Sequence, residues 1–345
     1  MLRKSDEIFQ PLNCLGTTLS ETYPASNILV KSFSIIIPVY NEEEGLPILY
    51  QRLLAIVDAL DYKTEIVFVD DGSSDQTVSM IKGWIESDSR VSLIELSRNF
   101  GHQTALTAGL DYTEGDVVLT MDGDGQHPPE LIPTLLKLYE RGNDVVLTQR
   151  ISSEGVVPFK KLSSRFFYSF INRISDLDLI PASADFRLLS KNVVHGIRNM
   201  REQHRFLRGM IAWMGYSVAI QPFEAPERIA GRSKYSLFKM FRFARDAIFS
   251  FSLAPVWFSF FLGSILLLFT ILETIYVLSF WLSGKQHLLE PGWSSLMFVI
   301  LFMGSFIFML LGLIGYYVGL VFQEVKKRPL YFVKSIHSGK KDNSC

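Results

Sequence analysis

Short apolar runs alternate with longer mixed segments between Phe33 and Gln149. The runs are rich in Val, Ile and Leu and occupy residues 33–39, 65–69, 91–96, 116–121 and 144–148. Continuous apolar runs of this kind are typical of strands that are buried on both faces of a sheet. The segments between them, such as 45–60 and 75–85, are long enough for crossover helices. The alternation therefore predicts an α/β fold with an open, mostly parallel sheet.

Polar and acidic clusters lie directly after three of these predicted strands. They are Tyr40-Asn41-Glu42, Asp70-Asp71 and Asp122-Gly123-Asp124. Open parallel sheets bind ligands beyond the carboxyl ends of their strands, so the clusters are expected to share one site. Asp122 and Asp124 can both turn toward one Mg²⁺ or Mn²⁺ ion, since these hard cations take oxygen ligands and share them with phosphates. A simple turn is the alternative for these two acids, but the second acidic pair favours a metal site.

Two long apolar runs follow, at 256–281 and 294–322. Each exceeds the ~20 residues that span the hydrocarbon core of a bilayer, and neither shows the polar face of a buried core helix. We therefore predict two transmembrane helices, over about 256–282 and 294–322. Glu273 is the one formal charge in the first run and is a functional candidate for that reason. Basic residues flank the pair, while Lys285 is the only Lys or Arg between the runs, which predicts cytoplasmic termini and a cytoplasmic α/β domain.

These patterns divide the chain into five regions. They are a mobile leader over 1–31, the α/β domain over 32–232, an interfacial amphipathic helix over 233–252, a two-helix membrane region over 253–323 and a basic cytoplasmic tail over 324–345. The interfacial helix is predicted because Phe alternates with Lys and Arg beside a spanning segment, although an amphipathic core helix has the same pattern. The leader contains no apolar run long enough for a signal peptide.

Composition narrows the functional classes. The formal net charge of −1 gives no reason to expect a nucleic-acid partner. The two cysteines, Cys14 and Cys345, cannot form a disulfide framework, which fits exposure to the cytosol. His102 and His127 have no His or Cys neighbour at a metal-binding spacing, so supporting or surface roles are expected rather than ligation.

Six segments of the chain form recognisable motifs. They are Ile37-Pro-Val-Tyr-Asn-Glu-Glu, Val69-Asp-Asp-Gly-Ser-Ser-Asp, Arg98-Asn-Phe-Gly-His-Gln, Met121-Asp-Gly-Asp-Gly-Gln-His-Pro-Pro-Glu, Ala184-Asp-Phe-Arg-Leu-Leu and Arg228-Ile-Ala-Gly-Arg-Ser-Lys-Tyr. Together they make the chain resemble the family 2 glycosyltransferases of GT-A fold, specifically the polyprenyl-phosphate glycosyltransferases. That group includes dolichol-phosphate mannose synthases and bactoprenol glucosyltransferases. The match extends from about Phe33 to Phe322 and implies a GT-A domain, Rossmann-like and mostly parallel, that is followed by membrane helices.

The resemblance implies roles for individual residues. The nucleotide-sugar would be bound by Pro38, Tyr40, Glu42, Asp70, Asp122, Arg228, Ser233 and Lys234. A Mg²⁺ or Mn²⁺ ion would be surrounded by Asp122, Asp124 and Gln126. The lipid phosphate would dock on Arg150, Lys160 and Ser164. The catalytic candidates are Asp124, Asp185 and Arg150, with Asp185 either activating or orienting the acceptor or serving as a structural carboxylate paired with Arg187.

The implied reaction is the metal-dependent, inverting transfer of a hexose from a nucleotide diphosphate-sugar to polyprenyl phosphate at the cytoplasmic membrane face. Asp185 stands where glucosyltransferase-like members have Asp and mannose synthases have Gly, which favours UDP-glucose over GDP-mannose. The product would be a polyprenyl-phospho-sugar for cell-envelope or glycan glycosylation. Membrane lipids are further expected partners, and a homo-oligomer is left open.

Three alternatives stand beside this reading. They are a GDP-mannose-dependent mannose synthase, a processive polysaccharide synthase and a non-catalytic membrane sensor of sugar nucleotides. The processive synthases carry a Gln-x-x-Arg-Trp motif and more membrane helices, and the sequence contains neither. The intact acidic clusters argue against a sensor.

Overall fold

The computed structural model describes residues 32–151, 183–203, 205–224 and 292–339, together with 180, 226 and scattered positions between 261 and 284. The following statements concern these residues. The predicted leader over 1–31 and the predicted interfacial helix over 233–252 lie outside them.

A single sheet of eight strands forms the centre of the molecule, in the order β7-β5-β6-β4-β1-β2-β3-β8. The strands are β1 (Ser32–Val39), β2 (Lys63–Asp70), β3 (Val91–Leu96), β4 (Val117–Thr120), β5 (Val145–Ile151), β6 (Ser183–Ser190), β7 (Val218–Glu224) and β8 (Val333–Ser338). The five runs predicted from the sequence correspond to β1–β5. Neighbouring strands are parallel across β4, β1, β2 and β3 and also between β5 and β7. The antiparallel strands are β6 and β8, so the sheet is mostly parallel, as predicted.

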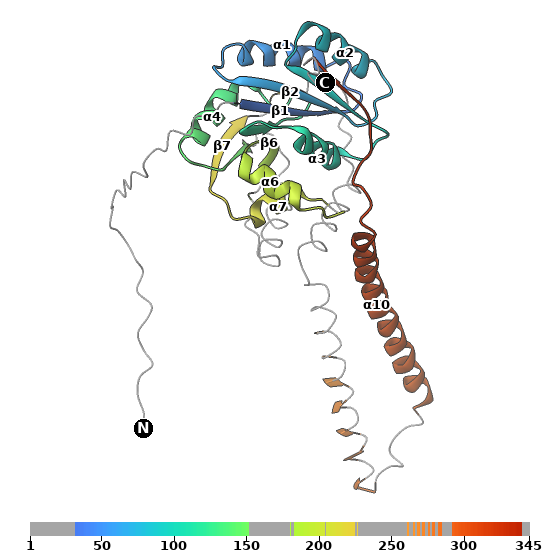
Figure 1. The fold of residues 1–345 in the computed structure, drawn as a ribbon. Helices are drawn as coiled ribbons and strands as arrows, with labels where there is room; N and C mark the ends of the chain where they lie inside the picture. Colours follow the sequence, from blue (N-terminus) through green and yellow to red (C-terminus); the bar gives the residue numbers. More distant parts are fainter. Residues whose placement is uncertain are drawn as a thin grey trace, which may run out of the picture.

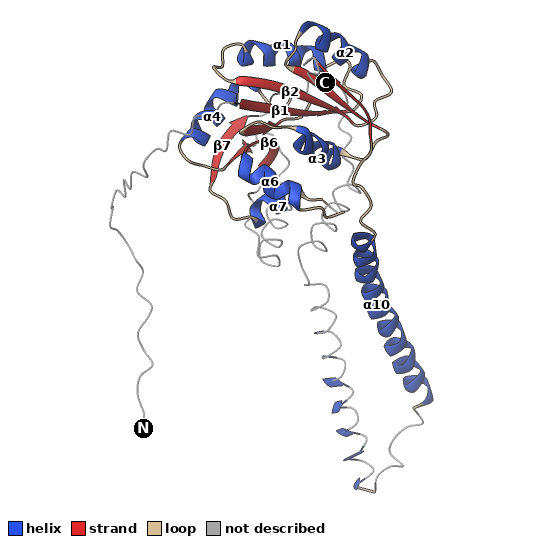
Figure 2. Ribbon diagram, viewed as in Figure 1, coloured by secondary structure: helices blue, strands red, loops and turns tan. Residues whose placement is uncertain are grey.

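Helices cover both faces of this sheet (Figure 1, Figure 2). On one face lie α1 (Leu46–Val57), α2 (Thr77–Ser87), the short 3-10 helix η1 (Pro129–Leu131) and α4 (Ile132–Glu140). On the other face lie α3 (His102–Tyr112), α6 (Lys191–Asn199) and α7 (Leu207–Trp213). The result is the three-layer arrangement expected of an α/β domain whose strands are buried on both sides.

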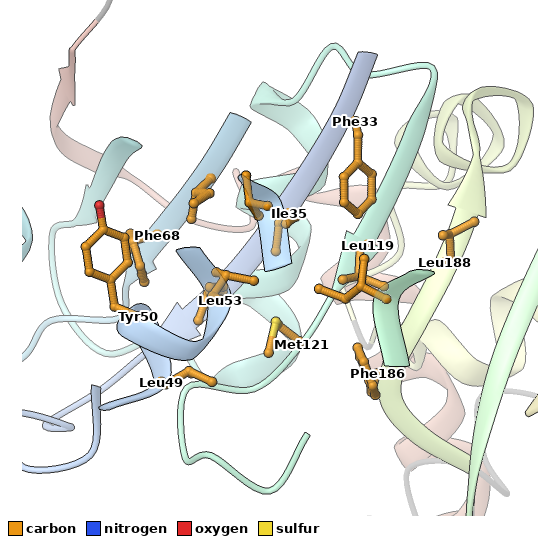
Figure 3. Packing of buried hydrophobic residues seen from close by; sticks show 14 of the residues in the cluster. Phe33, Ile35, Leu49, Tyr50, Leu53, Phe68, Leu119, Met121, Phe186 and Leu188 are labelled. Atoms are coloured by element: carbon orange, nitrogen blue, oxygen red, sulfur yellow. The ribbon is translucent and has the colours of Figure 1, made fainter. Parts of the chain in front are cut away.

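The alternation of side chains along β1 shows how the two layers are filled. Phe33 and Ile35 point into the core beneath α1, where they meet Leu53 and Phe68 (Figure 3). Ile36 points to the opposite core, against α3. A side chain on Gly109 of α3 would lie 2.3 Å from Cγ2 of Ile36, so glycine is required for α3 to pack this closely on β1.

A long apolar helix, α10 (Trp293–Val325), extends away from the sheet domain (Figure 1). Its bounds agree with the apolar run predicted over 294–322. Among the described residues it supplies the one stretch, Phe302–Val325, that is long and apolar enough to cross a membrane. The first predicted spanning helix, over 256–282, lies mostly outside the described residues, so the two-helix arrangement stays a prediction.

The chain returns to the sheet after α10. Val333–Ser338 forms β8, which pairs antiparallel with β3 from Ser92↔Ser338 to Leu96↔Val333. Part of the segment 324–345, predicted to be a basic cytoplasmic tail, is therefore the edge strand of the sheet. The basic residues of this segment concealed the alternation Val333-Lys-Ser-Ile-His-Ser, in which every second residue is exposed, as in an edge strand.

Candidate active site at the carboxyl edge of the sheet

Two loops at the carboxyl edge of the sheet, after β1 and after β2, are tied together by hydrogen bonds. The backbone N–H of Asn41 donates to Oγ of Ser73 (3.0 Å), and the backbone N–H of Ser74 donates to Oδ1 of Asn41 (2.8 Å). Asn41 adopts a left-handed backbone conformation, with φ of 53°, which Asn tolerates better than most residues. The N–H of Glu42 donates to Oγ1 of Thr77 (3.0 Å). Tyr40 and Glu42, both predicted to bind the nucleotide, thus sit on a loop with a fixed shape.

The carboxylates of Asp70 and Asp71 organise the neighbouring turns. Asp70 accepts hydrogen bonds from the backbone N–H groups of Gly72 and Ser73, at 3.1 Å each for its Oδ2. Asp71 accepts hydrogen bonds from the backbone N–H groups of Phe100 (2.7 Å) and Gly101 (2.9 Å). Both acids are buried, and burial raises the pKa of each above its ordinary value, although these hydrogen bonds oppose the shift. Asp71 therefore joins the β2 end to the loop that precedes α3.

Asp122 follows β4 and is held by a buried histidine. Its backbone N–H donates to Nδ1 of His127 (2.9 Å), whose ring stacks on Phe186 with 5.2 Å between the ring centroids. Burial lowers the pKa of His127, although Asp122 and Asp124 oppose that shift, and its Nδ1 is free to accept this bond. This geometry agrees with the supporting role predicted for His127, which stays a prediction.

The side chain of Asp122 is poorly satisfied by the protein. Its Oδ1 is buried and accepts no hydrogen bond within the described part of the chain. The nearest basic side-chain atom is Nε2 of His102, at 3.3 Å. Burial acts to raise the pKa of Asp122. The electrostatic effect of four basic side chains outweighs it and lowers the pKa overall; they are those of His127, His102, Arg208 and Arg187. An ionised carboxylate with an unpartnered oxygen fits a site that is completed by a bound cation.

Asp185 on β6 lies at the centre of a group of cationic and amide side chains. Its carboxylate accepts two hydrogen bonds from the guanidinium of Arg208, both at 3.2 Å, and a further one from Arg187 on the same strand. Gln103 donates to its Oδ2 (3.4 Å), and Nε2 of His102 lies 3.5 Å from that atom. This arrangement agrees with the structural alternative for Asp185, because two arginines hold the carboxylate. Whether it also orients the acceptor stays a prediction.

Arg150 and Gln126 contact one another on the same rim. The guanidinium of Arg150, at the end of β5, donates to Oε1 of Gln126 (3.1 Å). The backbone N–H of Gln126 in turn donates to Oδ1 of Asp124 (3.1 Å). The residue predicted to bind lipid phosphate is thereby linked to two of the predicted metal ligands.

The structure brings part of the predicted site together and leaves part outside the described residues. Asp70, Asp122, Asp124, Gln126, Arg150 and Asp185 lie along the edge reached by the loops after β1, β2 and β4, together with Pro38, Tyr40 and Glu42. The predicted residues Lys160, Ser164, Arg228, Ser233 and Lys234, and also Glu273, lie outside the described residues. Within those that are described, no three Asp, Glu, His or Cys side chains surround a common point. Protein atoms there would thus supply only part of the coordination sphere of a metal ion, as is usual where phosphates and waters supply the rest.

Comparison with known proteins decides the family. Residues 34–198 match the family described as Glycosyl transferase family 2. An uncharacterized glycosyltransferase of Synechocystis sp. is 40% identical over 310 residues, which cover 88% of this chain and 95% of that protein. This chain belongs to glycosyltransferase family 2.

Two further similarities were found. An SfII prophage-derived bactoprenol glucosyl transferase of Shigella flexneri is 36% identical over 310 residues, which cover 89% of this chain and 98% of that protein. Among solved structures, glucosyl-3-phosphoglycerate synthase from Mycobacterium tuberculosis, in complex with Mn²⁺, UDP-glucose and phosphoglyceric acid, matches with a TM-score of 0.42 and 19% identity. That match covers 69% of this chain and 83% of the other, and it is too weak to transfer ligands.

As a family 2 glycosyltransferase, the chain is an enzyme, and its candidate site includes residues beyond the site residues predicted from the sequence. His102, Gln103 and Arg208 all contact Asp185 or Asp122. His102 and Gln103 lie in a recognised motif, and Gly101 before them, with φ of 102°, marks the start of α3. The glycine before it therefore places His102 in the first turn of α3, just beyond the end of β3. Arg208 gives no such signal, because it approaches the site from α7, more than a hundred residues later in the chain.

Proposed function

We propose that this family 2 glycosyltransferase transfers a hexose from a nucleotide diphosphate-sugar to polyprenyl phosphate at the cytoplasmic face of a membrane. The observation that carries the proposal is the extent of the similarity to the bactoprenol glucosyl transferase, which covers 98% of that relative. A similarity of this extent includes the long apolar helix α10 as well as the sheet domain. A sheet domain joined to a membrane helix suits an acceptor that is anchored in the bilayer.

The donor would lie across the carboxyl ends of β1, β2 and β4. Tyr40 and Glu42 would contact the nucleotide from the loop that is tied to the β2 end. Asp122 and Asp124 would hold a Mg²⁺ or Mn²⁺ ion beside the donor diphosphate, and the unpartnered Oδ1 of Asp122 supports this assignment. When bound, such an ion offsets the negative charge of the departing nucleoside diphosphate.

The acceptor requires little activation. A phosphate monoester is largely ionised at neutral pH, so its oxygen can attack the anomeric carbon while the bond from that carbon to the nucleoside diphosphate breaks. Direct displacement of this kind inverts the anomeric centre. Arg150 would hold the acceptor phosphate, with Lys160 and Ser164 as further predicted contacts. Positioning and electrostatic stabilisation then supply most of the rate enhancement.

Glucose is the sugar that we propose, with uridine diphosphate as the leaving group. Asp185 supports this choice, because its position holds Asp in glucosyltransferase-like members and Gly in mannose synthases. The carboxylate is fixed by Arg187 and Arg208, so it can offer a rigid hydrogen-bond acceptor to a sugar hydroxyl. GDP-mannose remains the alternative donor.

The proposal is tested by incubating the purified full-length protein with polyprenyl phosphate, Mn²⁺ and one nucleotide-sugar at a time. The mass of the extracted lipid identifies the sugar. A lipid heavier by one hexose, formed from UDP-glucose, is the expected result. If the same product formed from GDP-mannose alone, the choice of sugar would be overturned. If no donor gave a sugar-bearing lipid, the proposed acceptor would be overturned.

Membrane orientation is tested separately. We propose that both termini and the sheet domain face the cytoplasm. An impermeant thiol reagent should then leave Cys345 unlabelled in intact cells and should label it after the membrane is opened. Labelling of Cys345 in intact cells would contradict this orientation.

A further inference from the structure

The last described segment of the chain contacts the loop that shapes the candidate active site. After α10, residues Tyr331–Val333 pass along the end of β3. Their last residue, Val333, is the first residue of the strand β8. We call Tyr331–Val333 the docking segment. It connects the end of a predicted membrane helix to the carboxyl edge of the sheet, where the site lies.

The strand that follows the docking segment is firmly anchored. The buried carboxylate of Glu95 on β3 contacts Nζ of Lys334 (3.4 Å) and Nε2 of His337 (2.9 Å), both from β8, and Nζ of Lys82 from α2 (2.7 Å). Although burial alone would raise it, hydrogen bonds from Lys82, Ser335 and His337 and the charge of Lys82 lower the pKa of Glu95 to about 2. The carboxylate is therefore ionised at neutral pH and holds β8 in register.

The docking segment itself contacts the loop 97–101 and the helix α3. The backbone N–H of Ser97, just beyond β3, donates to the carbonyl oxygen of Phe332 (2.9 Å). The ring of Phe332 lies 6.5 Å from the ring of Phe100, measured between centroids. The hydroxyl of Tyr331 donates to Oδ2 of Asp111 on α3 (2.8 Å). The segment thus contacts the loop 97–101 and the helix that this loop begins.

The same loop carries groups that reach the site. The N–H groups of Phe100 and Gly101 donate to Asp71 at the end of β2. The next residue, His102, places its Nε2 between the carboxylates of Asp122 and Asp185, at 3.3 and 3.5 Å. A displacement of the loop would therefore move His102 relative to both carboxylates and would loosen Asp71.

We propose that the docking segment is a positioning element for catalysis, which fixes the loop 97–101 and through it the place of His102 at the site. Tyr331 and Phe332 are positioning residues in this scheme, since they act through the loop and contact no reacting group. The docking segment also connects α10 to the site through the protein itself, whether or not the acceptor is bound. The inference rests on the proposed function only where its test measures sugar transfer.

The test compares the double variant Tyr331→Ala/Phe332→Ala with wild type in the full-length protein. Hydrogen exchange should become about tenfold faster at the amides of 97–103, because Ser97 loses a well-packed partner and the loop loses an aromatic contact. In the lipid-transfer assay kcat should fall on the order of tenfold, since small misplacements at a reacting centre have effects of this size or larger. The KM for the nucleotide-sugar should stay within about twofold.

Two matched variants separate positioning from general destabilisation. Ile336→Ala truncates an apolar side chain on β8 that is 51% exposed and lies opposite Ile94 rather than the loop 97–101, and it should leave both exchange and kcat unchanged. Phe332→Tyr keeps the ring and should retain wild-type kcat. Unchanged exchange at 97–103 in the double variant would overturn the proposal, and so would faster exchange with an unchanged kcat. If wild type itself transfers no sugar, the proposed function fails, while the exchange experiment still decides whether the segment fixes the loop.

Discussion

The acids at the end of β2 and the acids beyond β4 lie on the same edge of the sheet, but the protein uses them differently. Asp70 and Asp71 are buried, and backbone N–H groups donate to each of them. Asp122 keeps a buried oxygen that accepts no hydrogen bond in the described part of the chain. The first pair builds the loops that frame the site, whereas Asp122 keeps an oxygen for the cation that we propose the site binds. Acidity at a strand end is therefore not enough to assign a role, because the hydrogen bonds that already reach each oxygen decide it.

The largest effect on activity is expected at the acids beyond β4, where we propose that the metal ion binds. Asp124→Ala should reduce kcat for lipid glycosylation about 10³-fold, because it removes charge from the predicted metal site. The midpoint of thermal unfolding should change little, since the hydrogen bond from the backbone N–H of Gln126 to this side chain is local, two residues along the same loop. Steady-state kinetics and thermal unfolding of the same preparation check both parts. Glu86→Ala, which removes an exposed acid on α2, is the control, and substantial activity of Asp124→Ala or of wild type in excess chelator would refute the metal assignment.

The second effect should appear in stability. Asp71→Ala leaves two backbone N–H groups without their acceptor and should lower the free energy of unfolding by about 3 kcal/mol. Denaturant unfolding measures this change. Asp61→Ala, at an exposed position before β2, should have an effect within about 0.5 kcal/mol. Equal stability of Asp71→Ala and wild type would mean that the β2 acids are not structural, and the comparison would fail.

Glu95, an acid on β3, extends the comparison to a third strand. The pKa of Glu95 is lowered to about 2 in the folded protein from an ordinary value of 4.5, so its ionised form stabilises the fold. This contribution is fully present above pH 4.5 and is lost as the pH falls toward 2. Between pH 5 and 3, wild type should therefore lose about 2 kcal/mol more stability than Glu95→Gln. Parallel stability curves for the two proteins over this range would contradict the anchoring role of Glu95.

The smallest effect concerns the acceptor. Arg150→Ala should raise the KM for polyprenyl phosphate about tenfold, which is the effect expected from losing one charge-assisted hydrogen bond. The affinity for the nucleotide-sugar should stay nearly unchanged. Separate titrations of the two substrates distinguish these outcomes. A loss of nucleotide-sugar affinity with an unchanged KM for the lipid would place Arg150 in the donor site.

Much of the fold could be predicted because buried parallel strands have a simple sequence pattern. The runs that correspond to β1–β5 are apolar on both faces, and the acids that follow β2 and β4 mark the carboxyl edge. The strand β8 could not be predicted in this way. It is exposed on alternate positions and follows a basic stretch, and its partner β3 lies more than two hundred residues earlier in the chain.

The site was predictable only where a motif carried the chemistry. Asp122 and Asp124 were identified from their spacing and from the strand before them. The different environments of Asp71 and Asp122 were not, since each depends on atoms brought from distant loops, such as the N–H of Phe100 and the ring of His102. The pairing of Asp185 with Arg208 likewise arises from the packing of α7 against the sheet, which no local pattern encodes.

The most direct measurement is the mass of the lipid formed from UDP-glucose and polyprenyl phosphate by wild type and by Asp122→Asn, in the presence of Mn²⁺. Asn preserves the shape of the side chain and removes its charge, so folding should be retained. The account predicts a lipid heavier by one hexose from wild type and at least a hundredfold slower formation by the variant. It would be contradicted if wild type formed no such lipid, or if a folded Asp122→Asn formed it at the wild-type rate.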